Sequence, residues 1–221
     1  MAQDVKRTRR RYVSPKRQEQ ARRTRRDIVV AARGLLVERG YATTTIEAIA
    51  ADAGVAVQTI YSAVGNKRAV LWAVLETAVA GDDAPDTVLD RFRAAVGGAP
   101  DARTRLQRAV AFGRQVMERS ADVQRIMRSA ADSDPEVAAA LDEAERRRFR
   151  DSMAIVEAIA GDDGFREGID RRTAADLLFA ATSYEMYELL IQRRRWSAGR
   201  YSEGVTRVLD QLLPGSPARS E

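Results

Sequence analysis

The chain has 221 residues, with 37 Lys or Arg against 32 Asp or Glu for a formal net charge of +5, and it contains neither cysteine nor histidine. The composition therefore excludes disulfides, thiol nucleophiles, histidine general bases and metal sites built from cysteine or histidine. The sequence has no apolar run of about 18 residues, so we expect a cytoplasmic protein with no membrane span, no metal and no cofactor.

Positive charge is concentrated at the start of the sequence. Residues 1–26 hold 11 Lys or Arg and 2 Asp or Glu, a net charge of +9, whereas the remaining residues have a net charge of −4. Because like charges at this density repel one another, we expect residues 1–18 to form a disordered basic arm. Charge alone leaves two interpretations open, a solubilising tail or an arm that binds nucleic-acid phosphates.

Apolar residues recur at helical spacing through almost the whole chain, which predicts an all-α protein. The first predicted helix covers residues 19–39 and stops at Gly40. Its apolar stripe consists of Ile28, Ala31, Ala32, Leu35 and Leu36. A run of threonines at 43–45 then offers an N-cap for a short helix. Two more helices follow, over residues 57–63 and 67–79.

A second group of helices is predicted beyond the break at residues 82–85, whose sequence is Asp-Asp-Ala-Pro. The predicted ranges are 87–96, 103–119, 121–131, 135–160, 172–194 and 202–213. We assign residues 81–213 to a C-terminal helical bundle domain, which makes about nine or ten helices in all. Residues 214–221 are assigned to a loose tail.

The two short helices before the break have the pattern of a helix-turn-helix, in which one helix enters the major groove and the other braces it. A small residue, Ala50, is available where the helices cross, and Gly54 suits the turn. The apolar residues that would lock the pair are Ile46, Ile49, Val55 and Ile60. An ordinary helical hairpin with a polar outer face is the alternative interpretation. We assign residues 19–80 to a three-helix DNA-binding domain.

The run from Gly40 to Leu71 resembles the DNA-binding domain of TetR-type (TetR/AcrR) transcriptional regulators. The matching residues are Gly40-Tyr41, Thr44-Thr45, Ile49-Ala50, Ala53-Gly54-Val55, Thr59-Ile60-Tyr61 and Lys67. Past Leu75 only the all-helical layout is similar. Two departures stand out: Ala56 replaces a common serine cap, and Ala63-Val64 replaces a common histidine-phenylalanine pair. The operator sequence therefore cannot be taken from relatives.

The resemblance implies which residues contact double-stranded DNA. Thr44 and Thr45, with the start of their helix, would hold a phosphate. Residues that would grip the backbone beside the major groove are Thr59, Tyr61 and Lys67. Residues that would face base edges are Val57, Gln58 and Ser62. Residues that would reach the minor groove or flanking phosphates are Arg22, Arg25 and Arg26.

A short reading helix contacts few base pairs, so two-fold dimers on palindromic operators are the usual solution. The resemblance implies a homodimer formed by the last two helices. The predicted interface residues are Phe179, Thr182, Met186, Leu189, Val205, Val208, Leu209 and Leu212. The alternative is that these apolar stripes are internal core of a monomer.

The resemblance also implies a pocket for an unknown small-molecule effector among the middle helices. Methionine and aromatic side chains line adaptable apolar pockets well. The candidate residues are Phe112, Met117, Met127, Phe149, Met153, Tyr184 and Tyr187. Periodicity does not separate a pocket lining from ordinary core.

The interpretation that unites these features is a sequence-specific, DNA-binding transcriptional regulator, a repressor that its effector releases from the operator. An enzyme is disfavoured because the sequence has no phosphate loop, nucleophile elbow or metal-ligand spacing. A nonspecific architectural nucleic-acid-binding protein remains as the alternative. It would account for the basic arm but not for the long, acidic-leaning helical domain.

Overall fold

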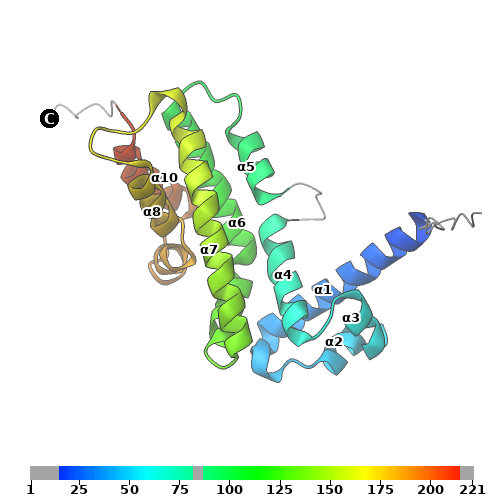
Figure 1. Cartoon of the computed structure of the whole chain (residues 1–221). Coiled ribbons are helices and arrows are strands. Elements are labelled where there is room, and N and C mark those ends of the chain that lie inside the picture. Colours follow the sequence, from blue (N-terminus) through cyan, green and yellow to red (C-terminus); the bar gives the residue numbers. More distant parts are fainter. Residues whose placement is uncertain (1–14, 82–86, 215–221) are drawn as a thin grey trace, which may run out of the picture.

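The computed structural model describes residues 15–81 and 87–214, and the regular structure in those ranges is entirely helical (Figure 1). Ten α-helices, α1–α10, are joined by turns and short 3₁₀ or π segments, and these ranges contain no strand. The predicted all-α class is confirmed. Most of the predicted basic arm and tail, and all of the predicted break, fall at residues 1–14, 82–86 and 215–221, outside the described residues.

The N-terminal unit consists of α1 (Pro15–Thr43), α2 (Ile46–Asp52), α3 (Val57–Ala63) and α4 (Lys67–Ala80). The start of α1 differs from the prediction, because residues 15–18, assigned to a disordered arm, are helical. Long unbranched side chains have high helix propensity, so charge density is a poor guide to disorder here. At Gly40 a backbone φ of 78° interrupts the helical geometry, as the predicted stop requires.

Side-chain caps determine where two of the short helices begin. The Thr45 hydroxyl accepts a hydrogen bond from the Ala48 amide (3.1 Å) at the start of α2, and Asn66 Oδ1 accepts one from Ala69 (3.0 Å) at the start of α4. The helix α3 begins at Val57, and its N-cap residue, Ala56, provides no side-chain hydrogen bond, as predicted.

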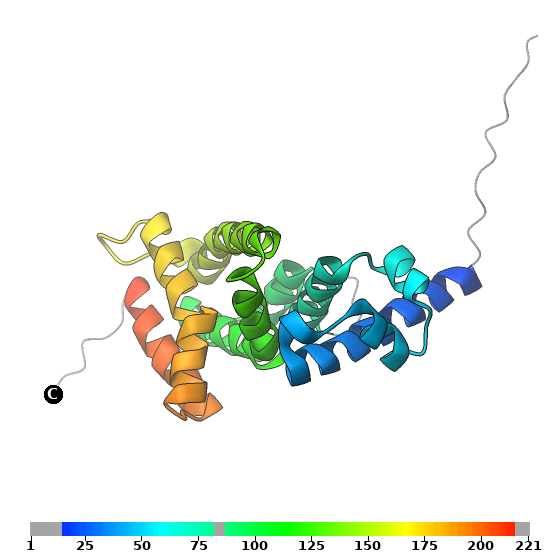
Figure 2. The same cartoon turned by 90° about the horizontal axis from the view of Figure 1, so that it is seen from below.

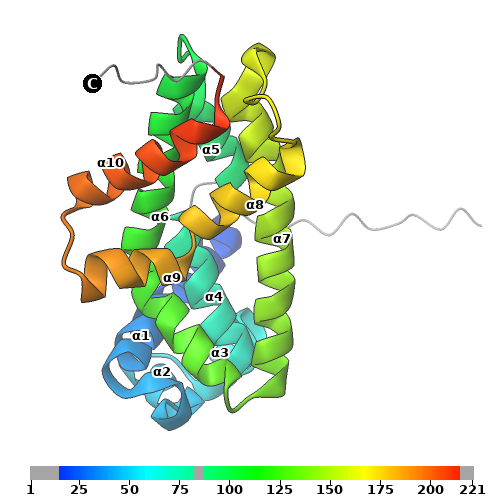
Figure 3. The same ribbon diagram turned by 90° about the vertical axis from the view of Figure 1, so that its left-hand side faces the viewer.

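The C-terminal unit is built around two long helices, α6 (Ala102–Ala131) and α7 (Pro135–Ala160), which run side by side (Figure 1). On one side of this pair lies α5 (Val88–Val96). On the other lie α8 (Arg171–Ala181), α9 (Tyr184–Tyr187) with the π-helix that continues it (Glu188–Arg193), and α10 (Ala198–Leu209) (Figure 3). Seen from below, the N-terminal helices extend from the opposite side of α6 and α7 (Figure 2).

Three predicted helix boundaries in this unit are wrong. Residues 103–119 and 121–131 form a single helix, because the buried Ser120 hydroxyl donates to the Val116 carbonyl (2.8 Å) and stays within the helix. The predicted helix 172–194 is broken at Ser183, whose side chain caps α9 by accepting from Met186 (3.1 Å). The last helix begins at Ala198 rather than 202, because Ser197 caps it.

Two apolar cores organise the molecule. One lies among α5–α10 and includes Leu106, Val110 and Leu209. The other lies under the short N-terminal helices, and it is completed by the second half of α6 through Val123 and Ile126. Each fully buried aliphatic side chain of this size stabilises the fold by about 1.5–3 kcal/mol. One long helix therefore contributes to the stability of both units.

The turn before α10 is held by an aromatic contact. The Trp196 ring lies so close to Gly204 that a Cβ atom added there would be 2.8 Å from the ring, whereas a Cβ at Gly199 would meet nothing within 4 Å. The Arg200 guanidinium covers the same ring, 4.3 Å from its centroid. The turn itself contains Arg195 with a positive φ of 56°. Trp196 therefore fixes the approach of this turn to α10.

Substituting the two glycines of α10 tests this contact. Gly199→Ala should be neutral or stabilising, because alanine favours a helix. Gly204→Ala should be less stable than Gly199→Ala by about 1–3 kcal/mol, because the added methyl displaces the indole. Urea unfolding measures the difference, and Trp196 fluorescence in a Trp72→Phe background reports the displacement. Equal stabilities with unchanged emission would contradict the packing described.

Candidate nucleic-acid interface

The helix α3 is held rigidly against α2 by a short turn. Ile49, Ala50 and Ile60 are buried between the helices. In the turn, Gly54 has a φ of 65°, and the Val55 amide donates to the Ala50 carbonyl (3.0 Å). Such a backbone conformation favours glycine. The turn and the apolar lock predicted from the sequence are both present.

The outer face of α3 is polar and open to solvent. Gln58, Tyr61 and Ser62 are exposed, Tyr61 by 48%, and Val57 and Thr59 are half-buried. The Ser62 hydroxyl donates to the Thr59 carbonyl (3.1 Å), so it is satisfied without a partner outside the helix. The residues predicted to face DNA are thus brought together on one surface, at the end of the molecule away from α8 and α10 (Figure 1).

The two threonines before α2 have different environments. Thr45 is exposed and caps α2. Thr44 is fully buried, and its hydroxyl donates to the Gly40 carbonyl (2.7 Å). We therefore correct the predicted DNA contact of the Thr44 side chain: its hydroxyl is used inside the protein, where it ties the end of α1 to the start of α2.

Lys67, at the start of α4, is folded back onto the protein. Its ammonium group donates to the Ala42 carbonyl (3.3 Å) and lies 4.3 Å from the centroid of the Tyr41 ring. Burial lowers the pKa of Lys67, and the nearby Asp134 carboxylate opposes that shift. Lys67 lies at the edge of the α3 surface, where it was predicted to bind a phosphate.

Arginines of α1 flank the same end of the molecule. Arg22, Arg25 and Arg26 are all exposed. Arg25 Nη1 donates to the Ala63 carbonyl (3.3 Å), so this side chain also fastens the last turn of α3 to α1. The guanidinium has five N–H donors, so this hydrogen bond leaves other donors of Arg25 available for a phosphate.

A polar junction, which the sequence patterns did not predict, joins the two units. Arg33 of α1 forms a two-pronged ion pair with Asp122 of α6 (Nη2–Oδ1 3.0 Å). At the start of α4, Arg68 pairs with Asp134 (3.3 Å) and with Glu136. These residues are far apart in the sequence, and none matches a motif, so no local signal pairs them.

The junction also contains a groove of about 300 Å³ between α4, α6 and α7. Its lining is mainly apolar. The lining residues are Asn66, Arg68, Ala69, Leu71, Trp72, Met127, Glu136, Val137 and Ala140. Met127 is the one residue of the predicted effector pocket that lies here.

The predicted effector residues are spread over two regions. Met117, Tyr184 and Tyr187 are buried in the C-terminal core, and the side chains packed partly buried against it are Phe112, Phe149 and Met153. Met127 also lies on α6, but it belongs to the other core, against the N-terminal unit, because the second half of α6 packs on α1 and α4. It is therefore separated from the other predicted effector residues.

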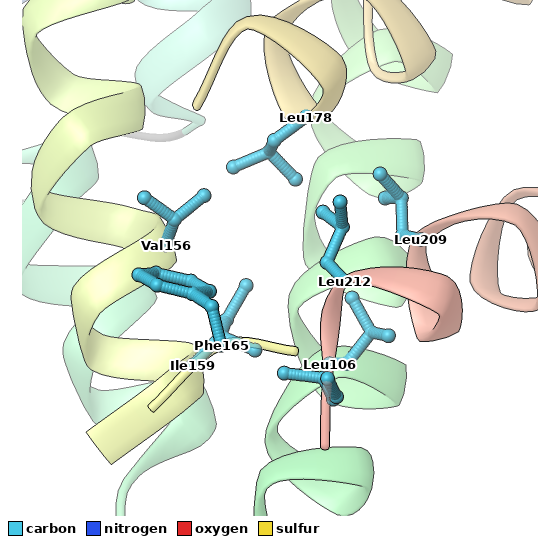
Figure 4. A pocket seen from close by; sticks show the side chains of 8 residues that line it. Leu106, Val156, Ile159, Phe165, Leu178, Leu209 and Leu212 are labelled. Carbon is cyan, nitrogen blue, oxygen red and sulfur yellow. The ribbon is translucent and has the colours of Figure 1, made fainter. Parts of the chain in front are cut away.

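A small cavity in the C-terminal core lies elsewhere (Figure 4). Its volume of about 10 Å³ leaves room for about one water molecule. The lining residues are Leu106, Val156, Ile159, Phe165, Leu178, Leu209, Leu212 and Leu213. None of the predicted effector residues lines it.

The predicted dimer residues also divide into two groups. Leu189 and Val208 are exposed, Val208 by 64%, and the partly exposed residues are Phe179, Thr182 and Met186. Those buried in the C-terminal core are Val205, Leu209 and Leu212. We correct the prediction for these three, which belong to internal core as the alternative interpretation held. A further exposed apolar residue, Leu177 of α8, was missed.

Nowhere in the described ranges do three or more acidic side chains gather in an arrangement that could hold a metal ion. Among the described helices, none combines the length and apolarity needed to cross a bilayer.

Comparison with known proteins agrees with this geometry. Residues 28–74 match the family model for bacterial regulatory proteins of the tetR family, which covers the second half of α1, all of α2 and α3, and the first part of α4. No curated protein sequence gives a significant match. The match to the family model is therefore the sequence-level evidence.

Solved structures share the fold over most of the chain. NalD, the secondary repressor of the MexAB-OprM multidrug efflux pump in Pseudomonas aeruginosa, is 19% identical with a TM-score of 0.65, covering 88% of this chain and 98% of NalD. The fatty acid degradation regulator FadR from Bacillus halodurans is 19% identical (TM-score 0.66, covering 90% and 96%). A TetR/AcrR-family transcriptional regulator from Thermobifida fusca is 24% identical (TM-score 0.59, covering 87% and 98%).

The family model places the match on the same helices that form the polar outer face and its rigid turn. The remaining helices have the layout of TetR-family structures. Residues 28–74 therefore match the tetR family of bacterial regulatory proteins, and the chain as a whole has the fold of solved structures that include a regulator of that family.

Proposed function

We propose that the protein is a sequence-specific transcriptional repressor that binds a palindromic operator as a homodimer and is released by a small-molecule effector. The observation that carries the proposal is the exposed face of α3, where Gln58, Tyr61 and Ser62 project from a helix pinned by the Gly54 turn. A rigid helix with small and polar outward residues suits the major groove. Exposed arginines of α1 add phosphate contacts beside it.

Pairing through α8 and α10 is supported by the apolar side chains left exposed there. Leu177, Leu189 and Val208 are 46%, 48% and 64% exposed, and they come from α8, the π-helix after α9 and α10, which lie together on the face in Figure 3. Contiguous exposed apolar surface is typical of interaction sites. Two-fold pairing there would leave the α3 surface of each protomer uncovered.

The proposal also includes the mode of regulation, namely repression of transcription and release from the operator by an effector. NalD is a repressor by its name, which supports repression as the mode for a chain of the same fold. An effector that preferred a state with altered spacing between the two α3 helices would weaken operator binding by the same coupling factor. Successive major grooves on one face lie about 34–36 Å apart, so small changes in spacing matter.

The tight packing of the C-terminal core determines how an effector could bind there. Its cavity holds about one water molecule, so an effector there requires side chains to move apart. Flexible methionines and partly buried aromatic rings, such as Met153, Phe112 and Phe149, suit such adaptation. The pocket is therefore proposed as one that opens on binding.

Selection of bound genomic fragments tests the proposal directly. We expect the purified protein to enrich a short palindromic motif and to retain it in mobility-shift assays with excess competitor DNA at near-physiological salt. Binding that disappears with competitor and follows salt alone would instead support a nonspecific architectural role.

Two substitutions at the α3 surface should separate base reading from phosphate binding. Gln58→Ala should cost about 1–3 kcal/mol at one base position and relax the preference there. Lys67→Ala should weaken binding to all sequences alike and reduce the salt slope by about 1. Competition binding over single-base operator variants at several salt concentrations measures both. Equal losses on every variant for Gln58→Ala would refute the base-reading role.

A charge placed on the exposed face of α10 should separate the protomers. Val208→Asp should shift the protein to monomer and weaken operator binding, because a buried unpaired carboxylate opposes pairing. Val30→Asp is the matched control, since Val30 is 67% exposed on α1 at the other end of the molecule. Analytical ultracentrifugation of both variants measures the oligomeric state. Dimers that persist in Val208→Asp would contradict this interface.

A further inference from the structure

One carboxylate, Asp134 in the turn between α6 and α7, contacts both units of the protein. Its Oδ1 accepts hydrogen bonds from the Glu136 and Val137 amides (3.1 and 3.4 Å) and so caps α7. Its Oδ2 accepts from the Tyr41 hydroxyl (3.3 Å) and pairs with Arg68 Nε (3.3 Å). The cap belongs to the C-terminal unit, whereas Tyr41 and Arg68 belong to the DNA-binding unit.

Tyr41 carries this contact to the DNA-binding surface. The hydroxyl end of its ring reaches Asp134, and the face of the ring lies under the Lys67 ammonium, 4.3 Å from the centroid. A cation over a tyrosine face is attracted by about 0.5–1 kcal/mol at exposed sites. The position of the Tyr41 ring thus depends on Asp134, and the ring in turn holds Lys67.

The first turn of α4 is therefore held from two directions by Asp134. Lys67 is reached through the Tyr41 ring, and Arg68, the next residue, is paired with the carboxylate directly. The charge of Asp134 also opposes the lowering of the Lys67 pKa that burial causes. Burial and then the charge of Asp134 raise the pKa of Tyr41, so its hydroxyl stays protonated and can donate to the carboxylate.

We propose that Asp134 is a positioning residue for DNA binding: through Tyr41 it sets the place of the Lys67 ammonium, and it thereby links the α6–α7 turn to a phosphate contact. The inference rests on the proposed function, because it needs Lys67 to bind a DNA phosphate. It adds a specific route from the C-terminal unit to that contact.

The route has a physical reason to work. Asp134 caps α7, so any displacement of the start of α7 moves the carboxylate with it. Such a displacement breaks or restores the contacts of Tyr41 and Arg68 with Asp134. When the contacts are broken, the Tyr41 ring no longer holds the Lys67 ammonium in one position. A lysine that is not held in place gives up more side-chain entropy when it binds a phosphate, which weakens the contact.

Conservative substitutions test the link. Tyr41→Phe keeps the ring under Lys67 but removes the hydroxyl that contacts Asp134. Asp134→Asn keeps an oxygen to cap α7 but removes the charge. Each should weaken operator binding by about three- to tenfold. Asp132→Asn is the matched control, because Asp132 is an exposed carboxylate of the same turn with no side-chain partner in the described ranges. The operator affinity of this variant should equal that of the unmodified protein.

A double-mutant cycle with Lys67→Ala decides whether the effect passes through the lysine. If it does, Tyr41→Phe should cost nothing further in the Lys67→Ala background. If Tyr41→Phe weakens operator binding by the same factor with and without Lys67, the inference is overturned while the proposed function stands. A wild-type protein that ignores every duplex would remove both together.

A measurement without DNA separates positioning from simple loss of structure. With Lys67 labelled at its ε-methylene, the Tyr41 ring current should shift its resonance away from that of an exposed lysine. Asp134→Asn should move the resonance toward the exposed value at an unchanged melting temperature, whereas Asp132→Asn should not. A resonance that Asp134→Asn leaves in place would overturn the inference.

Discussion

The sharing of α6 between two apolar cores is the constraint on which the rest of the structure depends. Its first half packs with α5, α7 and α10, and its second half completes the core beneath α1 and α4. A helix of 30 residues is stiff over this length. A displacement of α6 in the C-terminal unit would therefore also change the packing beneath α1 and α4.

Polar contacts then determine how the two units meet. The apolar core is non-directional, but the pairs Arg33–Asp122 and Arg68–Asp134 require particular side chains to face one another. Ion pairs of this partly exposed kind contribute little stability, about 0–1 kcal/mol each. Their value at this junction is orientation, since they fix the register of α1 and α4 against α6 and α7.

The N-terminal unit was predictable because its signals are local. The stop at Gly40, the turn at Gly54 and the uncapped start of α3 at Ala56 each depend on residues within a few positions. The structure of the C-terminal unit was harder to predict from the sequence. The burial of Ser120 inside α6 and the exposure of Leu177 depend on which helices become neighbours, and the spacing of apolar residues does not contain that information. The same limit applies to Thr44 and to the contacts of Asp134.

The uneven placement of charge along the chain has a consequence for how the molecule meets its target. Exposed arginines gather on α1 at the DNA-binding end, and the sequence after residue 26 carries a net charge of −4. The arginines in the first half of α1 lie beside the α3 surface, and Arg25 contacts the last turn of α3 at the Ala63 carbonyl. Positive charge at this position attracts a polyanion, so it favours encounters in which the α3 surface faces that polyanion.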